Sequence, residues 1–412
     1  MSAGDETEEL AREAKPAEGL GLLEIAREIP GAVDLHTPAG ADAARLRITG
    51  VQHDSRKVEP GDLYVVRRGA SFDGRTFLRD VIARGASAVL AARDLEVPEL
   101  SVPVLRVSDV AEGLAYAAAA VYGHPAFSLD IVGVTGTNGK TTTTHLVRAA
   151  IDGAIGKPSC GVVGTVGHSF AGRTVSASHT TPEADELARV LAVMKKRGAT
   201  HAAMEVSSIA LVLGRVAAVR FRVAAFTNLT QDHLDFHGSM EAYAEAKLRL
   251  FTSVGPGLAV VNVSDPFGEK VAQAARCKVL RVRTEPGAKG ADVFAERVDE
   301  SAAGMRILAR TPSGPAEITT RFVGRHNVEN LLVALGIASA LELDVERAAA
   351  GLSVERGAPG RLERCDGVGD DVVVLVDYAH TPDALARVLE AVRPAASTPG
   401  ARVVCEIGRA HV

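Results

Sequence analysis

Short apolar runs alternate with amphipathic stretches along most of the chain, which is the pattern of an α/β protein. Four apolar runs are candidate strands: DIVGVTG from Asp130, HAAMEVSS from His201, RVAAFTNL from Arg222 and LAVVNVS from Leu258. Helix-compatible segments separate them. Continuous hydrophobicity indicates strands that are buried on both faces, so we expect a mostly parallel sheet covered by helices.

The same pattern predicts the order of the domains. We expect a polar leader, a small α/β unit, a central domain with the parallel sheet, and a third, Rossmann-like unit. Their respective ranges are residues 1–44, 45–125, 126–344 and 345–412. In the small unit, apolar runs at 63–66 and 88–91 flank a helix-compatible stretch at 76–84.

The elements expected after residue 285 do not add up to a complete third domain. A Gly-, Pro- and Thr-rich stretch at 285–320 predicts an antiparallel addition before a helix at 328–341. Beyond it we expect a strand at 372–377, a helix at 382–392 and a strand at 402–405. A βαβ unit cut after its second strand leaves one edge and one face uncovered, so the third domain is expected to be incomplete.

Composition narrows the function classes. At roughly 150 residues per domain, 412 residues suggest two or three domains. With 46 basic and 51 acidic residues and no Trp, neither a phosphate-tracking surface nor a stacking platform is evident, which argues against nucleic acid. The acidic opening lacks a signal-peptide pattern, no apolar run could span a bilayer, and the four cysteines form no CxxC pair. We expect a cytoplasmic protein without membrane contact.

A glycine-rich turn after the first central strand carries the clearest chemistry. The string TGTNGKTTTT joins DIVGV to a helix-compatible segment, an arrangement in which backbone N–H groups and a helix N-terminus face an anion. The candidate loop residues are Gly136, Thr137, Asn138, Gly139, Lys140, Thr141 and Thr142. Lys140 would approach the terminal phosphates and the Thr141 hydroxyl would bind Mg²⁺. The strict GxxxxGK[ST] spacing is not met, so a plain strand-to-helix turn stays open.

The variant GVTGTNGKTTT resembles the ATP-binding loop of the Mur ligase family, the amide-forming enzymes of peptidoglycan precursor synthesis, and that of the related folylpolyglutamate synthases. The chain contains, in this order, HDSRKVEPGDLYVVRRGASFDGRTF, TTPEADEL, MEVSS, FTNLTQDHLDFHGSMEAYAEAK, GRHNVEN, APGRLE and DYAHTPDAL. This order resembles the branch of the family that adds a diamino acid. It implies a three-domain architecture with UDP bound by the first domain and ATP by the second. HDSR and DYAHTPDAL disfavour the folylpolyglutamate synthases.

The resemblance also implies a metal site. Glu205 and His233 would hold Mg²⁺ with Thr141, and Lys247 would be carbamylated and support a second Mg²⁺, so that Lys140, Lys247, His233 and Glu205 are the catalytic candidates. From the residues alone, Lys247 is expected to be a solvated helix lysine near Glu241 and Glu245, and its carbamylation is implied only by the resemblance. His233 and His237 stand four apart, as in a zinc-binding helix, but the Glu of HExxH and a third ligand are missing.

By the same resemblance, further residues contact the ligands. Asn327 and Asn330 would lie at adenine, Arg361 at phosphate and Asp377 at ribose, the last two on domain closure. Asp54 and Ser55 occupy the uridine position, and Thr180, Thr181, Ser207 and Arg215 map to the muramoyl dipeptide. Taken alone, a Ser or Thr here would more often be a cap or turn residue. Ile209 and His179 depart from the family's usual His and Asn.

The expected reaction uses MgATP to activate the D-glutamate γ-carboxylate of UDP-MurNAc-L-Ala-D-Glu as an acyl phosphate, which an amine of a diamino acid then attacks. The family usually adds meso-diaminopimelate, with L-lysine the alternative, and the motif that discriminates is absent. Residues 406–412, EIGRAHV, match one translation frame of a common sequencing adapter, which suggests a non-native tail. The chain as given is expected to be a monomer that binds its substrate but ligates little; a non-catalytic nucleotide or UDP-sugar binding protein stays open.

Overall fold

The computed structural model describes residues 3–69, 73–285, 287, 290–301, 304–367, 370, 372–379, 382–396 and 401–408. The chain divides into two compact units. Unit 1 comprises residues 1–131, 167–200 and 207–220, and unit 2 comprises residues 132–166, 201–206 and 221–412.

Unit 1 is built around a small, mostly parallel sheet with strand order β2-β7-β6-β5-β4. Its strands are β2 (Asp34–His36), β4 (Gly50–Gln52), β5 (Asp62–Val65), β6 (Ala88–Ala92) and β7 (Val104–Val107). Strands β4 to β7 run parallel and β2 is antiparallel to β7. The predicted apolar runs at 63–66 and 88–91 therefore form neighbouring strands, and the stretch at 76–84 forms a short 3₁₀ turn followed by a helix.

The helices of unit 1 are α1 (Ala3–Ala14), α2 (Leu22–Glu28), α3 (Leu78–Ala83), α4 (Val110–Val121), α5 (Pro125–Ser128), α7 (Ala184–Lys196) and α8 (Ser208–Val212). Of these, α4 packs on β4 and β6 of the sheet, and α2 and α7 pack on α4. Shorter elements are β1 (Leu20–Gly21), β3 (Arg47–Ile48), η1 (Ser55–Lys57), η2 (Gly74–Phe77) and the hairpin strands β10 (Gly167–Phe170) and β11 (Arg173–Val175). Segments from the range expected as a leader join this unit, because β2 pairs with β7 and α1 packs on α7.

Unit 2 contains the predicted central sheet, with strand order β9-β12-β8-β13-β14-β15-β16-β17-β18. The strands are β8 (Asp130–Thr135), β9 (Cys160–Gly164), β12 (His201–Glu205), β13 (Phe221–Phe226), β14 (Leu258–Asn262), β15 (Lys278–Arg283), β16 (Val293–Ser301), β17 (Gly304–Thr311) and β18 (Gly314–Thr320). Strand β12 pairs parallel with β9, and β13, β14, β15 and β16 pair parallel in succession. Strands β16, β17 and β18 pair antiparallel. The α/β class and the antiparallel addition are confirmed.

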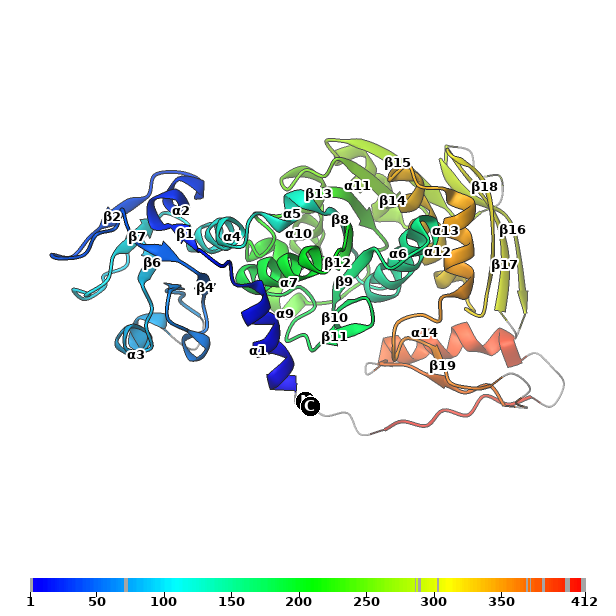
Figure 1. Ribbon diagram of the computed structural model, residues 1–412. Coiled ribbons are helices and arrows are strands. Elements are labelled where there is room, and N and C mark those ends of the chain that lie inside the picture. The colour runs from blue at the N-terminus through cyan, green and yellow to red at the C-terminus, as the bar shows by residue number, and fades with distance from the viewer. Residues whose placement is uncertain are drawn as a thin grey trace. The chain divides into compact units, whose positions relative to one another are not determined.

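The helices of unit 2 bury the core strands. They are α6 (Lys140–Ile155), α9 (Leu234–His237), α10 (Met240–Thr252), α11 (Pro266–Ala274), α12 (Arg325–Ala340), α13 (Val345–Val354) and α14 (Pro382–Val392). Figure 1 shows α6, α12 and α13 side by side, and all three contact one another. Their apolar residues share one core with the strands, including Leu146, Leu331 and Leu352, all fully buried.

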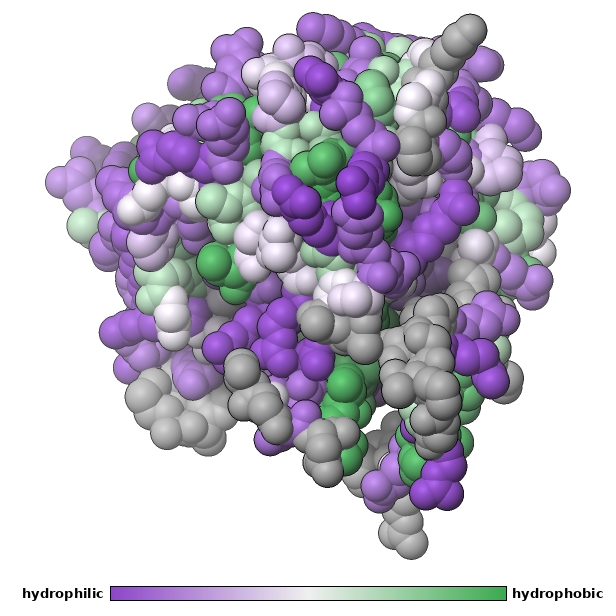
Figure 2. Space-filling model, turned by 90° about the vertical axis from the view of Figure 1, so that its right-hand side faces the viewer, coloured by the Kyte–Doolittle hydropathy of each residue, from purple (hydrophilic) through white to green (hydrophobic). Residues whose placement is uncertain are grey.

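The outer strands β16 to β18 alternate between core and solvent. Met305, Ile307 and Ala309 face the core, whereas Arg306 forms an ion pair with Glu317 across β17 and β18. The side of the molecule on which these strands are drawn in Figure 1 faces the viewer in Figure 2 and is mostly hydrophilic, with small separate hydrophobic patches. This alternation is what an antiparallel sheet with one solvated face requires.

The last segment differs in part from the prediction. The helix at 382–392 is confirmed, but the strand expected at 372–377 is reduced to β20 (Leu375–Val376), which pairs with β19 (Glu363–Arg364); η3 (Arg393–Ala396) follows α14. The strand expected at 402–405 is wrong, because residues 401–408 are exposed and pair with no strand among the described residues.

Arg409–Val412 of the proposed tail, and His380 and Thr381 of the DYAHTPDAL string, lie outside the described residues. The domain boundary near residue 345 stays a prediction; α13 packs on α6 within unit 2.

No helix in the described part of the chain is both long and apolar enough to cross a membrane.

Candidate functional site

The predicted phosphate loop follows β8 and opens α6, as its sequence requires. Gly136 has φ 149°, and a Cβ there would overlap the Thr227 hydroxyl and lie 3.1 Å from the backbone of Asn228. Gly139 has φ 83°, and its Cβ would lie 2.5 Å from Asn330 Oδ1. Both positions therefore need glycine for the backbone angle and for space. The loop brings the N-terminus of a 16-residue helix to its end, where an anion is favoured.

Residues after β13 hold this loop in place. Thr227 Oγ1 donates to Asn138 O at 2.7 Å, and Asn228 Oδ1 accepts from Asn138 N at 2.9 Å. Thr137 Oγ1 donates to Thr230 O at 3.0 Å. The sequence analysis quoted this TNLT string but gave it no role. The signal was present, because TNLT ends a candidate parallel strand and such strands end at one edge of a sheet.

Thr141 and Glu205 lie together, as predicted. The Thr141 hydroxyl donates to Glu205 Oε2 at 2.9 Å, and Glu205 Oε1 accepts from Thr165 N at 2.7 Å. Glu205 is 1% exposed at the end of β12. A hydroxyl beside a fixed, buried carboxylate supplies two oxygen ligands of the kind that Mg²⁺ prefers.

Two lysines share one carbonyl of the loop. Lys140 Nζ donates to Gly136 O at 3.0 Å and to Thr137 O at 2.8 Å, and Lys247 Nζ donates to Gly136 O at 2.8 Å. Lys247 is 1% exposed, so the expectation of a solvated helix lysine is wrong. The helix-compatible sequence around Lys247 does not show which face of α10 is covered. Burial lowers the pKa of Lys247 well below its ordinary value, and Lys140 nearby acts in the same direction. Burial also lowers the pKa of Lys140, against the opposite effect of Glu205.

Tyr243 of α10 links the loop to the histidines. Its ring lies 4.3 Å from Lys247 Nζ, its hydroxyl is 3.1 Å from Thr137 Oγ1, and burial raises its pKa to about 12. The ring centroids of His233 and His237 lie 6.1 Å and 5.2 Å from that of Tyr243. Sequence analysis missed Tyr243, which stands one helical turn before Lys247. Among the described residues, no group of three or more His, Cys, Asp or Glu side chains is placed to hold a metal ion.

The two candidate adenine residues lie on α12, and Asn330 lies against Gly139 of the loop. Asn330 Oδ1 accepts from the Thr143 hydroxyl at 3.2 Å, and Asn327 Nδ2 donates to Val323 O at 2.9 Å. Both side chains are buried. Arg361 lies over the Tyr378 ring, 5.2 Å from its centroid. Asp377 accepts from the backbone N–H groups of two residues, Leu362 and Ala379, so its carboxylate is already bonded within its own segment.

The candidate substrate residues form a separate polar group in unit 1. Thr181 Oγ1 accepts from Ser207 N at 2.9 Å and donates to Ser207 Oγ at 3.3 Å, while Ser207 also caps α8. Arg215 Nη1 donates to Thr181 O at 2.9 Å. The structure therefore brings these three residues together. Thr180 precedes Thr181 at the same turn.

Asp54 and Ser55 occupy the turn before and at the start of η1. Asp54 accepts from the backbone N–H of Arg56 at 3.0 Å and from its guanidinium at 2.8 and 2.9 Å. The hydrogen bond from the Arg56 guanidinium lowers the pKa of Asp54. The predicted uridine residues thus lie on an ordered turn.

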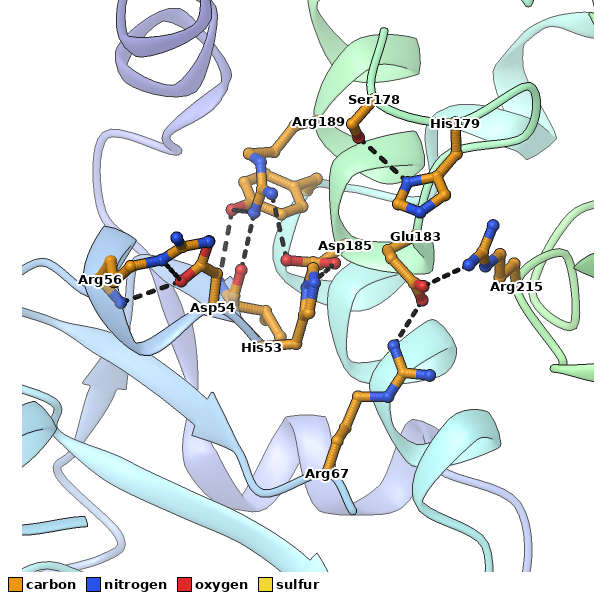
Figure 3. A network of polar contacts seen from close by, with 12 residues as sticks. His53, Asp54, Arg56, Arg67, Ser178, His179, Glu183, Asp185, Arg189 and Arg215 are labelled. Atoms are coloured by element: carbon orange, nitrogen blue, oxygen red, sulfur yellow. Dashed lines mark hydrogen bonds and ion pairs between the residues drawn. The ribbon is translucent and has the colours of Figure 1, made fainter. Parts of the chain in front are cut away.

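His53, beside them, bonds to a buried carboxylate that sequence analysis did not single out. His53 Nδ1 lies 2.8 Å from Asp185 Oδ1, and Arg189 donates to Asp185 Oδ2 at 3.1 Å and to Val51 O at 2.7 Å (Figure 3). Burial opposes the charge on His53, but Asp185 raises its pKa overall. Burial alone would raise the pKa of Asp185, but Arg189 and His53 hold it well below its usual value. This network fixes the HDSR turn on α7.

Comparison with known proteins agrees with this geometry. The model described as "Mur ligase family, catalytic domain" matches residues 47–122, and "Mur ligase middle domain" matches residues 134–338. A UDP-N-acetylmuramoyl-L-alanyl-D-glutamate--2,6-diaminopimelate ligase from Gloeobacter violaceus is 45% identical over 364 residues, which cover 88% of this chain and 72% of that protein. The enzyme of the same name from Pseudomonas aeruginosa is 42% identical over 365 residues, 88% of this chain and 74% of that protein.

A solved structure under the same enzyme name superposes with a TM-score of 0.76 at 31% identity, covering 92% of this chain and 75% of that one.

Proposed function

The chain belongs to the Mur ligase family, and on that premise we propose that it is an ATP-dependent ligase that joins a diamino acid to UDP-MurNAc-L-Ala-D-Glu. The relatives named above are 2,6-diaminopimelate ligases, which favours meso-diaminopimelate over L-lysine as the added amino acid. The proposed site of action is the cytoplasm, which is consistent with membership of the Mur ligase family. The observation that carries the proposal is the Thr141–Glu205 pair at the opening of α6, directly after a glycine loop.

In this proposal, the loop binds the phosphates of ATP. The backbone from Gly136 to Thr141 and the N-terminus of α6 favour negative charge, and Lys140 adds a cation whose ammonium group already lies at the loop. Asn327 and Asn330 would contact adenine, and Arg361 and Asp377 would contact phosphate and ribose.

Thr141 and Glu205 would hold Mg²⁺, and the residues present suit it. A hydroxyl and a buried carboxylate oxygen are hard ligands, and the carboxylate is already aligned by two hydrogen bonds. When bound, Mg²⁺ would offset the negative charge that develops on the phosphoryl oxygens.

Lys247 would act in the carbamylated form. Its low pKa favours the neutral amine, whose nitrogen can attack the carbon of CO₂ and lose a proton to give a carbamate anion. The product is a carboxylate-like ligand, so the side chain would change from a buried amine to an oxygen donor that would hold a second Mg²⁺ with His233. The hydrogen bond to Gly136 O places this group at the phosphate loop.

The proposed reaction has two steps. The γ-carboxylate of D-glutamate attacks the terminal phosphorus of ATP, ADP leaves, and the amine of the diamino acid then displaces phosphate from the acyl phosphate. Thr180, Thr181, Ser207 and Arg215 would orient the muramoyl dipeptide, and Asp54 and Ser55 would bind uridine. Arg215 supplies a fork of donors suited to a carboxylate or phosphate.

An ADP-release assay tests the proposal. The complete gene product is incubated with MgATP and UDP-MurNAc-L-Ala-D-Glu, with meso-diaminopimelate, L-lysine or neither, and the peptide product is identified by mass spectrometry, because the match covers 72% of the Gloeobacter relative. ADP release that requires the UDP substrate and is greatest with meso-diaminopimelate supports the proposal. Saturable binding of both nucleotides without any release would instead support a binding protein, and failure to bind either would refute both.

A further inference from the structure

Glu183 joins two arginines of unit 1. Its Oε1 lies 2.7 Å from Arg215 Nη2 and its Oε2 lies 2.5 Å from Arg67 Nη1, as Figure 3 shows. The side chain is 11% exposed, that of Arg215 is 8% exposed and that of Arg67 is 23% exposed. One carboxylate against two guanidinium groups leaves this cluster positively charged. A largely buried carboxylate with both oxygens committed to arginines is costly to disturb.

The orientation of Glu183 is not explained by its place in the fold. Glu183 is the N-cap residue of α7, where an acidic side chain can accept a hydrogen bond from the first turn of its own helix. Glu183 makes no such cap. Its carboxylate is directed to Arg67 and Arg215 instead, so the helix forgoes about 1 kcal/mol of capping for this arrangement.

Arg215 depends on few contacts. Its Nη1 donates to Thr181 O and its Nη2 pairs with Glu183, while its buried Nε has no hydrogen-bond partner in the described part of the chain. The residue also lines a small apolar cavity with Ala119 and Ala188, so packing around its stem is incomplete. The direction of the guanidinium therefore rests on two acceptors, and Glu183 is the charged one.

These contacts lead directly to the candidate dipeptide residues. Glu183 holds Arg215, Arg215 donates to Thr181 O, and Thr181 Oγ1 accepts from Ser207 N. We infer that Glu183 is a positioning residue, which aims Arg215 at the anionic peptide end of the UDP substrate without touching that substrate itself. The inference rests on the proposed function, because it takes UDP-MurNAc-L-Ala-D-Glu as the ligand.

Calorimetry on the full chain tests this role with three ligands: UDP-MurNAc-L-Ala-D-Glu, UDP alone and MgATP. Glu183→Gln should weaken binding of the complete substrate at least tenfold and leave UDP and MgATP within twofold, because the uridine turn at Asp54 and the phosphate loop do not contact Glu183. Glu183→Asp keeps the charge but shortens the reach, so it should lose about threefold. The matched control is Glu186→Gln in the same helix, whose carboxylate lies 3.7 Å from His168 Nε2; all three affinities should stay within twofold.

The outcomes separate this inference from the proposed function. If the unaltered chain does not bind the complete substrate, the proposed function fails and the inference with it. If the unaltered chain binds and Glu183→Gln binds equally well or more tightly, only the inference is overturned; tighter binding would mean that Glu183 competes with the substrate for the arginines. Equal losses for UDP and the complete substrate would also overturn it. If Glu183→Gln does not fold, Glu183→Asp decides, and unchanged affinity for the complete substrate overturns the inference.

Discussion

Replacing Gly139 by Ala should impair nucleotide binding through one side chain. The Cβ would lie 2.5 Å from Asn330 Oδ1 and 3.3 Å from its Cγ, and φ is 83°. An ordinary contact needs at least about 3.4 Å, so Asn330 or the loop must move by about 1 Å. Asn330 is buried and bonded to Thr143, so it cannot simply swing away.

The magnitude combines two effects. A non-glycine residue in the left-handed region costs about 1–2 kcal/mol, and overpacking of a buried site costs about 1–3 kcal/mol. A shift of about 1 Å at a phosphate loop can cost about 100-fold in function. We therefore expect MgATP affinity to fall between about 10-fold and 100-fold, which is about 1.4–2.7 kcal/mol.

Gly172→Ala is the matched control for the backbone effect. Gly172 has φ 81°, nearly the same angle, and a Cβ there would meet nothing within 4 Å. Calorimetry with MgATP and urea unfolding should show that Gly172→Ala loses about 1–2 kcal/mol of stability and no affinity. In a double-mutant cycle, Asn330→Ala should make Gly139→Ala less costly by at least about 0.5 kcal/mol. Equal MgATP affinity for Gly139→Ala and the unaltered chain would refute the reasoning.

Three further predictions concern buried charges and the metal site. Asp185 raises the pKa of His53 above its ordinary 6.5, so the ion pair stabilises the fold fully below about pH 6.5 and this stabilisation is lost as pH rises through the folded-state pKa. His53→Ala should therefore lower the free energy of unfolding in urea by about 1–3 kcal/mol at about pH 6 and by less at about pH 9. A loss of stability that grows with pH would contradict this. Arg189→Met leaves the fully buried Asp185 without its arginine and should lower the free energy of unfolding in urea by about 3–5 kcal/mol. Unchanged stability would show that the ion pair is dispensable. Thr141→Val removes the hydroxyl that faces Glu205, so ATP affinity should fall about tenfold with Mg²⁺ and change little in EDTA; equal losses in both conditions would argue against a metal role for Thr141.

The sequence predicted most of the fold because buried parallel strands are continuous apolar runs. The strands that begin at Asp130, His201, Phe221 and Leu258 form where the pattern places them. The pattern failed at residues 402–405, since a strand also needs a partner, and pairing over long separations leaves no local signal. The same limit explains β2, whose exposed residues predict no strand and which forms only on the edge of β7.

The candidate site was predictable where the groups that bind the ligand are neighbours in the sequence. The loop from Gly136 to Thr141 could be read directly, because glycines, a lysine and a hydroxyl follow one strand. Glu183, His53 and Tyr243 could not, because each acts through a partner far away in the sequence, such as Arg67 for Glu183. A buried lysine gives no signal of its burial, so Lys247 was identified only through the family resemblance.

Calorimetric titration of the folded chain with MgATP tests the central claim most directly. The account predicts saturable binding at one site per chain, a higher unfolding temperature in the presence of MgATP, and at least a tenfold loss of affinity for Lys140→Ala. No saturable heat from chain shown to be folded, or equal affinity for Lys140→Ala, would contradict the account.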